Sequence, residues 1–260
     1  MTDFHVSVAG SAMTRHRRTD ERLAAAVAHV AALDPAPDAI LCTGDLVDEG
    51  SDAEYARLRE LLSPLTRPVY VVPGNHDERE ALRRAFADRG YFPASGRLDY
   101  VVDVGPIRVV AVDTNVPGSS GGRLGADGLA WLAATLDEAR DRPTVIMQHH
   151  PPMTTGMARM DEMGLEDAEA EAAVIARHPH VERILCGHFH RPIAARVGGT
   201  LASTCPSTAH QVELDLRRAG RLAVVNEPPA VQLHVWAGGR LVSHTSYVGD
   251  HGAPEVLVGE

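Results

Sequence analysis

Four short runs of Asp, Asn and His follow apolar segments in this 260-residue chain. They are Gly44-Asp45, Gly74-Asn75-His76-Asp77, His149-His150 and Gly187-His188-Phe189-His190. The chain holds 14 histidines, and imidazole is the commonest side-chain ligand of transition metals. Carboxylate and amide oxygens mixed with imidazole nitrogens favour Mn, Fe, Co or Zn over Mg or Ca. The four runs therefore predict a transition-metal site.

The apolar segments before these runs have the length of β-strands. Hydrophobic patterning predicts strands over 39–42, 69–72, 107–112, 144–147 and 183–186. It predicts helices over 20–33, 53–62, 79–87, 127–139 and 165–177. This alternation is typical of a sheet with crossover helices, in which ligands bind at the carboxyl edge of the strands. We therefore expect the four runs to converge at that edge, where the glycines before Asp45, Asn75 and His188 permit a sharp exit from the strand.

The last third of the chain has a different pattern. After residue 193 the sequence predicts only strands and turns, with a hairpin turn at 237–240. We interpret residues 1–260 as one domain with a β-rich C-terminal tail over 193–247. The segment 150–166 contains four methionines, whose flexible side chains adapt to varied apolar surfaces. It is a candidate for a lid that faces the substrate, and packing of this loop against the core is an equal alternative.

Composition limits the partners and the compartment. The formal net charge of −10 argues against a nucleic-acid polymer as partner, because affinity for phosphate backbones needs clustered positive charge. No apolar stretch of 18 residues exists, so we expect no membrane association. Cys42 and Cys186 lie in apolar runs and predict buried thiols rather than a disulfide framework. We expect a cytoplasmic protein.

Each run alone is explained as an ordinary turn or loop, but the set is not. In their order along the chain, the four runs resemble the motifs of the calcineurin-like binuclear metallophosphoesterases, in particular the branch of cyclic-nucleotide phosphodiesterases and glycerophosphodiesterases. The resemblance extends over nearly the whole chain. It implies an α/β fold, a four-layer α-β-β-α sandwich of two mixed β-sheets flanked by helices.

The family's first motif, Asp-x-His, requires a choice. Asp3-Phe4-His5 has the right spacing, and we prefer it to a decayed motif at Val8-Ala9-Gly10. Family members carry an apolar strand before this motif, whereas only Met1 and Thr2 precede it here. Either the numbered chain lacks that strand or the protein manages without it. Without the strand, Asp3 and His5 would lie on a fraying terminus.

The resemblance implies two divalent transition metals (Mn, Fe, Co or Zn) that share one carboxylate and provide a bridging hydroxide as nucleophile. Its metal ligands map onto seven residues: Asp3, His5, Asp45, Asn75, His149, His188 and His190. Asp45 would bridge the metals. His76 would face the phosphate without binding metal, stabilising it or protonating the leaving oxygen, and Asp77 would orient the His76 imidazole.

Two further histidines need an interpretation. His150 is expected to pack behind the metal ligands, and His210 is expected to lie outside the cleft.

The sequence thus predicts a hydrolase of small phosphodiesters, of the 3′,5′-cyclic nucleotide or glycerophosphodiester type. The alternatives are a phosphomonoesterase or nucleotide pyrophosphatase of the same fold, or a metal-binding module of low activity. Because β-rich C-terminal tails often pair, a homodimer stays open.

Overall fold

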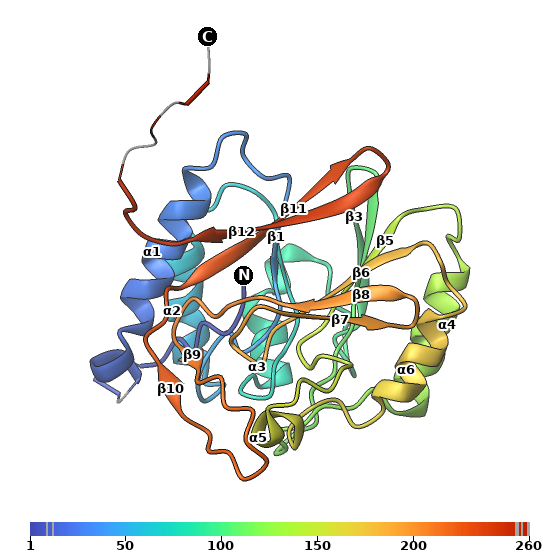
Figure 1. Ribbon diagram of the computed structural model, residues 1–260, viewed down its shortest axis with the longest axis horizontal. Helices are drawn as coiled ribbons and strands as arrows, with labels where there is room; N and C mark the ends of the chain where they lie inside the picture. Colours follow the sequence, from blue (N-terminus) through green and yellow to red (C-terminus); the bar gives the residue numbers. More distant parts are fainter. Residues whose placement is uncertain (9, 12, 253–254, 256, 259–260) are drawn as a thin grey trace.

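A mixed six-stranded sheet forms the centre of the computed structural model, which describes residues 1–8, 10–11, 13–252, 255 and 257–258 (Figure 1). The strand order is β3-β4-β5-β6-β8-β7. The inner strands β4, β5, β6 and β8 are parallel, and the outer strands β3 and β7 run antiparallel to their neighbours. The bounds are β3 Tyr100–Val104, β4 Ile107–Ala111, β5 Thr144–Met147, β6 Val181–Cys186, β7 Ile193–Val197 and β8 Thr200–Thr204.

The two faces of this sheet are covered by different layers. Val110, Ile146 and Ile184 pack on one face against helices α4 (Gly125–Asp137) and α6 (Ala168–Ile175). Their sequence neighbours point to the other face, because successive strand residues alternate between faces. There they meet a second layer of strands.

That second layer consists of two separate ribbons. Strands β1 (Ile40–Cys42) and β2 (Val69–Val71) pair in parallel, and β11 (Ala230–Ala237) pairs antiparallel with β12 (Arg240–Tyr247). On its outer side lie the helices α1 (Thr19–Ala31), α2 (Asp52–Leu62) and α3 (Arg79–Ala85) (Figure 1). The predicted order of layers is therefore confirmed. The second sheet differs from the expectation, because no ladder joins β1 to β11 among the described residues.

The remaining elements are short. They are a π-helix (Met13–Arg17), a 3-10 helix (Ala87–Arg89), α5 (Ala158–Asp161), β9 (Gln211–Val212) and β10 (Val224–Val225). Gly238 and Gly239 connect β11 to β12 with φ angles of 58° and 76°. Positive φ at both central residues is what a type I′ hairpin turn requires, and glycine adopts it without strain.

The N-terminal segment lies against β1. The Met1 ammonium group donates to the Leu41 carbonyl at 2.9 Å, and the Asp3 and His5 N–H groups donate to the carbonyls of Gly44 and Asp45 at 3.0 and 3.1 Å. The side chains from residue 1 to residue 6 are buried. The expected fraying of Asp3 and His5 is therefore wrong, because backbone hydrogen bonds and burial fix both residues in place.

A buried carboxyl group lies under the six-stranded sheet. Glu171 of α6 is fully buried and accepts a hydrogen bond from Gln148 Nε2 at 3.1 Å. Burial raises the pKa of Glu171 to about 8, and the Gln148 hydrogen bond only partly opposes that rise. The folded chain thus holds a proton that the unfolded chain releases near pH 4.3.

This difference predicts a loss of stability with rising pH. Between about pH 4.3 and 8 the folded state binds one more proton than the unfolded state, so its stability falls as pH rises. Glu171→Gln removes the titration. We compare the free energy of unfolding of the variant with that of the parent at each pH. We expect this difference to shift in favour of the variant by about 2 to 4 kcal/mol between pH 4.5 and pH 8. Urea unfolding of the metal-free proteins checks this, with the exposed Glu169→Gln as control. An equal pH dependence in all three proteins would contradict the assignment.

Candidate metal centre

Four predicted ligands form a first cluster at the carboxyl edge of the strands. One ligand atom from each of Asp3, His5, Asp45 and His190 lies within 4.8 Å of the others. His5 Nε2 lies 3.2 Å from His190 Nε2, and His190 Nε2 lies 3.4 Å from Asp3 Oδ1. Two imidazole nitrogens that face each other beside two carboxylates form a donor set that suits a transition-metal cation. These residues fit a metal.

The other predicted ligands lie on the opposite side of Asp45. His149 Nε2 lies 3.2 Å from Asn75 Oδ1 and 3.4 Å from Asp45 Oδ1. The ring centroid of His188 lies 5.0 Å from that of His149. In contrast, Asp45 Oδ2 faces His5 Nε2 at 3.7 Å. The two oxygens of Asp45 therefore point to different clusters, which is one arrangement in which a carboxylate can bridge two cations.

The charges around Asp45 keep it ionised. Burial alone would raise the pKa of its carboxyl group, but His149, His5 and His76 hold the pKa well below its usual range. For His149, burial opposes the charged form, but Asp45 outweighs it and raises the pKa to about 9. Burial lowers the pKa of His188 to about 3. Asp45 is thus a carboxylate anion, which is the form that binds metal cations.

Backbone strain is concentrated in the predicted ligands. Outside glycine, six described residues have positive φ, and five of them are predicted metal ligands. These five are Asp3 (52°), His5 (46°), Asp45 (48°), His188 (69°) and His190 (52°). Such conformations cost of order 1 kcal/mol or more each and persist where the surrounding structure enforces them, most often at functional sites. The fold holds these side chains in a shared arrangement at an energetic cost.

The motif glycines leave room for the ligands. A Cβ atom on Gly44 would lie 2.5 Å from His149 Nδ1, and one on Gly74 would collide with Asp45 Oδ1. A Cβ on Gly187 would lie 3.0 Å from Asp3 Oδ2. Each of these glycines thus permits a close approach between its own strand exit and a ligand carried by another segment of the chain.

His76 differs from the ligands in its exposure. Its side chain is 39% exposed, whereas the ring of His149 is fully buried. His76 Nδ1 lies 2.7 Å from the Asp48 carbonyl, so Nδ1 carries the proton and donates. Burial lowers the pKa of His76, but Asp45 and Asp48 outweigh it and the net shift is upward. The charged groups of the protein therefore favour the protonated imidazolium form of His76.

The predicted role of Asp77 in orienting His76 does not match its contacts. Asp77 Oδ1 accepts a hydrogen bond from Tyr55 Oη at 2.8 Å, and Oδ2 accepts from the N–H groups of Leu46 and Gly74 at 3.1 and 2.8 Å. Its carboxyl group therefore joins the two ligand-bearing loops to each other and to helix α2. The Asp48 carbonyl takes the orienting role instead.

Other supporting residues were not predicted from the sequence. Arg79 forms a two-pronged ion pair with Asp113, with distances of 2.6 and 3.0 Å, and also donates to the Asn115 carbonyl. Asn115 Nδ2 in turn donates to the carbonyls of Gly74 and Asp77. These residues hold the loop that carries Asn75 and His76. The available signal was Asp113-Thr114-Asn115 directly after a predicted strand, the same pattern as in the other runs.

The expectation that His210 lies outside the cleft is wrong. Its ring centroid lies 4.6 Å from that of His190 and 5.3 Å from that of His5. Its carbonyl is 2.7 Å from His190 Nδ1, so it orients a metal ligand. Ser207 Oγ accepts from the His210 N–H at 3.2 Å and itself donates to the Asp3 carbonyl at 2.8 Å. His210 is therefore a residue of the site.

The methionine-rich segment contacts the second cluster. His188 Nε2 lies 2.9 Å from the Met163 carbonyl, and Met157 and Met160 pack with Phe189. His150 is fully buried, with Nδ1 2.8 Å from Thr114 Oγ1, and its ring offers a nitrogen within 4.8 Å of those of His149 and His188. The segment thus lies at the rim of the site, where a lid would be placed.

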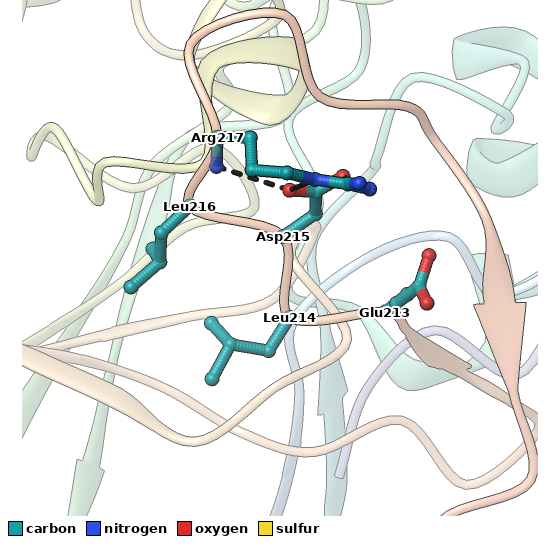
Figure 2. Close-up of a pocket in the computed structure, with 5 residues that line it drawn as sticks. All are labelled: Glu213, Leu214, Asp215, Leu216 and Arg217. Atoms are coloured by element: carbon teal, nitrogen blue, oxygen red, sulfur yellow. Dashed lines mark hydrogen bonds and ion pairs between the residues drawn. The ribbon is translucent and has the colours of Figure 1, made fainter.

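A loop after β9 lies beside this segment. Figure 2 shows Leu214 and Leu216 pointing away from the ion pair between Asp215 and Arg217. The two leucines are 56% and 64% exposed. Farther along the loop, the Gly220 carbonyl accepts from Arg159 Nε of α5 at 3.2 Å. Exposed apolar surface therefore adjoins the proposed lid.

Comparison with known proteins identifies the family. The profile of the family described as Calcineurin-like phosphoesterase matches residues 1–192. The chain belongs to this family. The match includes all seven predicted metal ligands, so the resemblance seen in the sequence motifs is confirmed.

The family includes phosphodiesterases that are similar to this chain over most of its length. A probable glycerophosphodiester phosphodiesterase GpdQ of Arcobacter nitrofigilis is 34% identical over 98% of this chain and 94% of its own length. A 3′,5′-cyclic adenosine monophosphate phosphodiesterase CpdA of Pseudomonas aeruginosa is 35% identical over 81% of this chain and 75% of its own length. Among solved structures, a dimetal phosphatase from Danio rerio shares the fold with a TM-score of 0.64, at 15% identity over 96% of this chain and 98% of its own.

Proposed function

We propose that this family member hydrolyses small phosphodiesters, of the 3′,5′-cyclic nucleotide or glycerophosphodiester type, with two divalent transition metals per chain. The observation that carries the proposal is the division of the Asp45 oxygens between the His5 and His149 clusters. Two relatives that cover most of this chain bear the names of phosphodiesterases for these two substrate types. The donor set of carboxylate, amide and imidazole suits Mn, Fe, Co or Zn.

Bound metals would supply a water ionised near neutral pH and would neutralise charge on the phosphoryl oxygens. Asp3, His5, Asp45 and His190 would hold one metal, and Asn75, His149 and His188 would hold the other together with Asp45. The chain's own part in the reaction lies with His76. Because its Nδ1 donates to the Asp48 carbonyl, Nε2 is the nitrogen left to face the substrate. From there an imidazolium can donate its proton to the leaving oxygen.

The other roles are those of support. The buried Asp77 carboxyl group keeps the ligand loops together, and His210 adds a neutral imidazole beside the first cluster, because burial lowers its pKa to about 2. The segment around Met163 is the proposed lid. The homodimer stays an open proposal, supported by the exposed leucines of the loop after β9 and by exposed Val235 and Tyr247 of the β11–β12 ribbon.

We place the protein in a reducing compartment, the cytoplasm, on the support of its cysteines. All three, Cys42, Cys186 and Cys205, are free and buried. Among the described residues, no helix combines the length and the apolar character needed to cross a membrane. The net charge of −10 continues to argue against a nucleic-acid polymer as substrate.

Substrate class separates this proposal from its alternatives. With Mn²⁺ added, we expect kcat/KM for an aryl phosphodiester to exceed that for the matching monoester by at least about 10-fold, and we expect cyclic AMP or a glycerophosphodiester to be turned over. Rates on the panel with and without EDTA check this. A preference for the monoester would replace the proposal with a phosphomonoesterase. Metal binding without turnover would indicate a binding module.

A further inference from the structure

A group of arginines lies beside the first cluster of the metal centre. The π-helix Met13–Arg17 leads into α1, and this stretch of the chain carries Arg15, Arg17, Arg18 and Arg22. Arg22 Nη1 donates to the Ala209 carbonyl, and Arg22 Nη2 donates to Asn226 Oδ1 at 3.2 Å. The start of α1 is therefore fixed against the loop that carries His210, next to β10 (Figure 1).

His210 connects these arginines to the predicted metal ligands. Its ring centroid lies 4.6 Å from that of His190 and 5.3 Å from that of His5. Burial is the main reason that the pKa of His210 is low, and His190 and His5 add to the effect. The positive charges of Arg17 and Arg22 lower this pKa further. Because solvent and salt screen distant charges, both guanidinium groups must lie near the first cluster.

The protein does not balance the charges of Arg17 and Arg22. Among the described residues, no carboxylate forms an ion pair with either guanidinium group, and both side chains are half-buried. The acidic residues in the first turn of α1 pair with other arginines, Glu21 with Arg18 and Asp20 with Arg57. Arginine has five N–H donors, and Arg22 uses two of its donor groups on uncharged oxygens. Both residues therefore keep donors and charge available for a ligand.

Unpaired cations beside a centre for metal cations are unfavourable unless an anion lies between them. The phosphoryl group of a diester carries one negative charge, which bound metals would neutralise. The arginines are then left for a second negative charge on the same substrate, and their planar guanidinium groups match a carboxylate or a phosphate. His210 Nδ1 is buried and has no hydrogen-bond partner among the described residues, so it is a further polar atom open to a ligand here.

We propose that Arg17 and Arg22 form a subsite for an anionic group on an alcohol portion of the phosphodiester. The inference rests on the proposed function, because it names the class of diester that the metal centre takes. A diester with a negatively charged alcohol is favoured over one with a positively charged alcohol such as choline. A 3′,5′-cyclic nucleotide has no second charge and leaves the subsite empty.

Three diesters of glycerol phosphate test this preference. They differ only in the second alcohol, which is hydroxypropionate (an anion), propanol (neutral) or choline (a cation). With the Mn²⁺-loaded protein, we expect kcat/KM to be at least about 10-fold higher for the anionic diester than for the choline diester, mainly through KM. The ratio should fall between about 0.01 M and about 1 M salt, because the screening length falls from about 30 Å to about 3 Å. A ratio near one at low salt would overturn the inference.

Variants of Arg17 assign the preference to the subsite, because Arg17 can be changed without removing the contact of Arg22 with the Ala209 carbonyl. We expect Arg17→Gln to lower the ratio by about 5-fold or more, Arg17→Lys to keep most of it, and Arg17→Glu to favour the choline diester. The matched control is Arg177→Gln, which removes an exposed arginine at the end of α6. If Arg17→Gln and Arg177→Gln give the same ratio, the preference does not come from this subsite and the inference is wrong.

Direct binding distinguishes a failure of the inference from a failure of the proposed function. Calorimetric titration of the Mn²⁺-loaded protein compares carboxyethylphosphonate with propylphosphonate, in which a methyl group replaces the carboxylate. We expect carboxyethylphosphonate to bind at least about 5-fold more tightly, and we expect Arg17→Gln to remove the difference. If no diester is hydrolysed but this difference is found, the proposed function fails and the subsite stands. Equal affinities, or no binding of either phosphonate, would overturn the subsite.

Discussion

Replacing Asp45 should cause the largest loss of activity that one substitution produces in this chain. Its two carboxylate oxygens face different clusters, with Oδ2 3.7 Å from His5 and Oδ1 3.4 Å from His149. Asp45→Ala removes both oxygens and therefore a ligand of each metal. We expect turnover of an aryl diester to fall by about 10³-fold or more, because both the nucleophile and the charge neutralisation depend on the metals.

Asp45→Asn separates ligation from backbone strain. Asp45 has a φ of 48°, a conformation that Asn tolerates and Ala does not. Asn keeps the volume and the backbone but provides one neutral oxygen instead of two anionic ones. We expect both variants to hold fewer than two metals per chain and to lose the pairing with His149, whereas Asp45→Ala should lose more stability in the metal-free state than Asp45→Asn because of its backbone conformation.

Metal analysis after gel filtration and thermal melting check these expectations. The control is Asp52→Ala, which removes an exposed carboxyl group at the start of α2. It should keep the parent's metal content and activity. Two tightly held metals in Asp45→Asn would contradict a bridging role and would assign the His5 and His149 clusters to independent sites.

The sequence was most informative where strand, glycine and ligand follow one another. The strand predicted over 144–147 coincides with β5, because a continuous apolar run is typical of a strand buried on both faces. Gly44, Gly74 and Gly187 marked the strand exits, and the structure gives the reason, since each lies against a ligand from another segment of the chain. These local patterns were sufficient to place the ligands at one edge.

What the sequence did not predict depends on contacts between distant segments. Strand β3 was not predicted, because Tyr100–Val104 is an outer strand with only partial burial and a charged Asp103. His210 lies in no motif, and its position is set by Ser207, which contacts the Asp3 carbonyl from 204 residues away. Tyr55 has the pattern of a core residue of α2, and only the fold brings its hydroxyl group to Asp77.

The separation of the second sheet into two ribbons has the same origin. Patterning predicted the segments that form β1, β11 and β12, but it contains no information on which edges meet. The two ribbons β1–β2 and β11–β12 are separate ladders, and the half-buried Leu41 and Trp236 lie between them only because the fold brings β1 and β11 to the same face of the six-stranded sheet. Local sequence therefore predicts which segments of this chain form strands, but it does not predict which strands pair with each other.

His76→Ala should separate the chemical step from metal binding. The His76 side chain is 39% exposed, and its Nδ1 donates to the Asp48 carbonyl. Both observations are consistent with a histidine that faces the substrate and does not bind a metal. We expect the variant to keep both metals and to lose about 10- to 10⁴-fold in turnover, the range typical of proton transfer or charge stabilisation. The exposed His16→Ala is the control and should keep full activity.

A series of aryl phosphodiesters with leaving groups of rising pKa then identifies the role of His76. If its imidazolium protonates the leaving oxygen, the loss in His76→Ala should be small for the most acidic phenol and should grow as the leaving group becomes more basic, because a poor leaving group depends more on the proton. An equal loss across the series would leave His76 only an electrostatic role. His5, Asp48 and His76 also lie close enough together to share a cation. Loss of a metal from His76→Ala would therefore show that His76 is a ligand, and the assignment of the proton donor would be wrong.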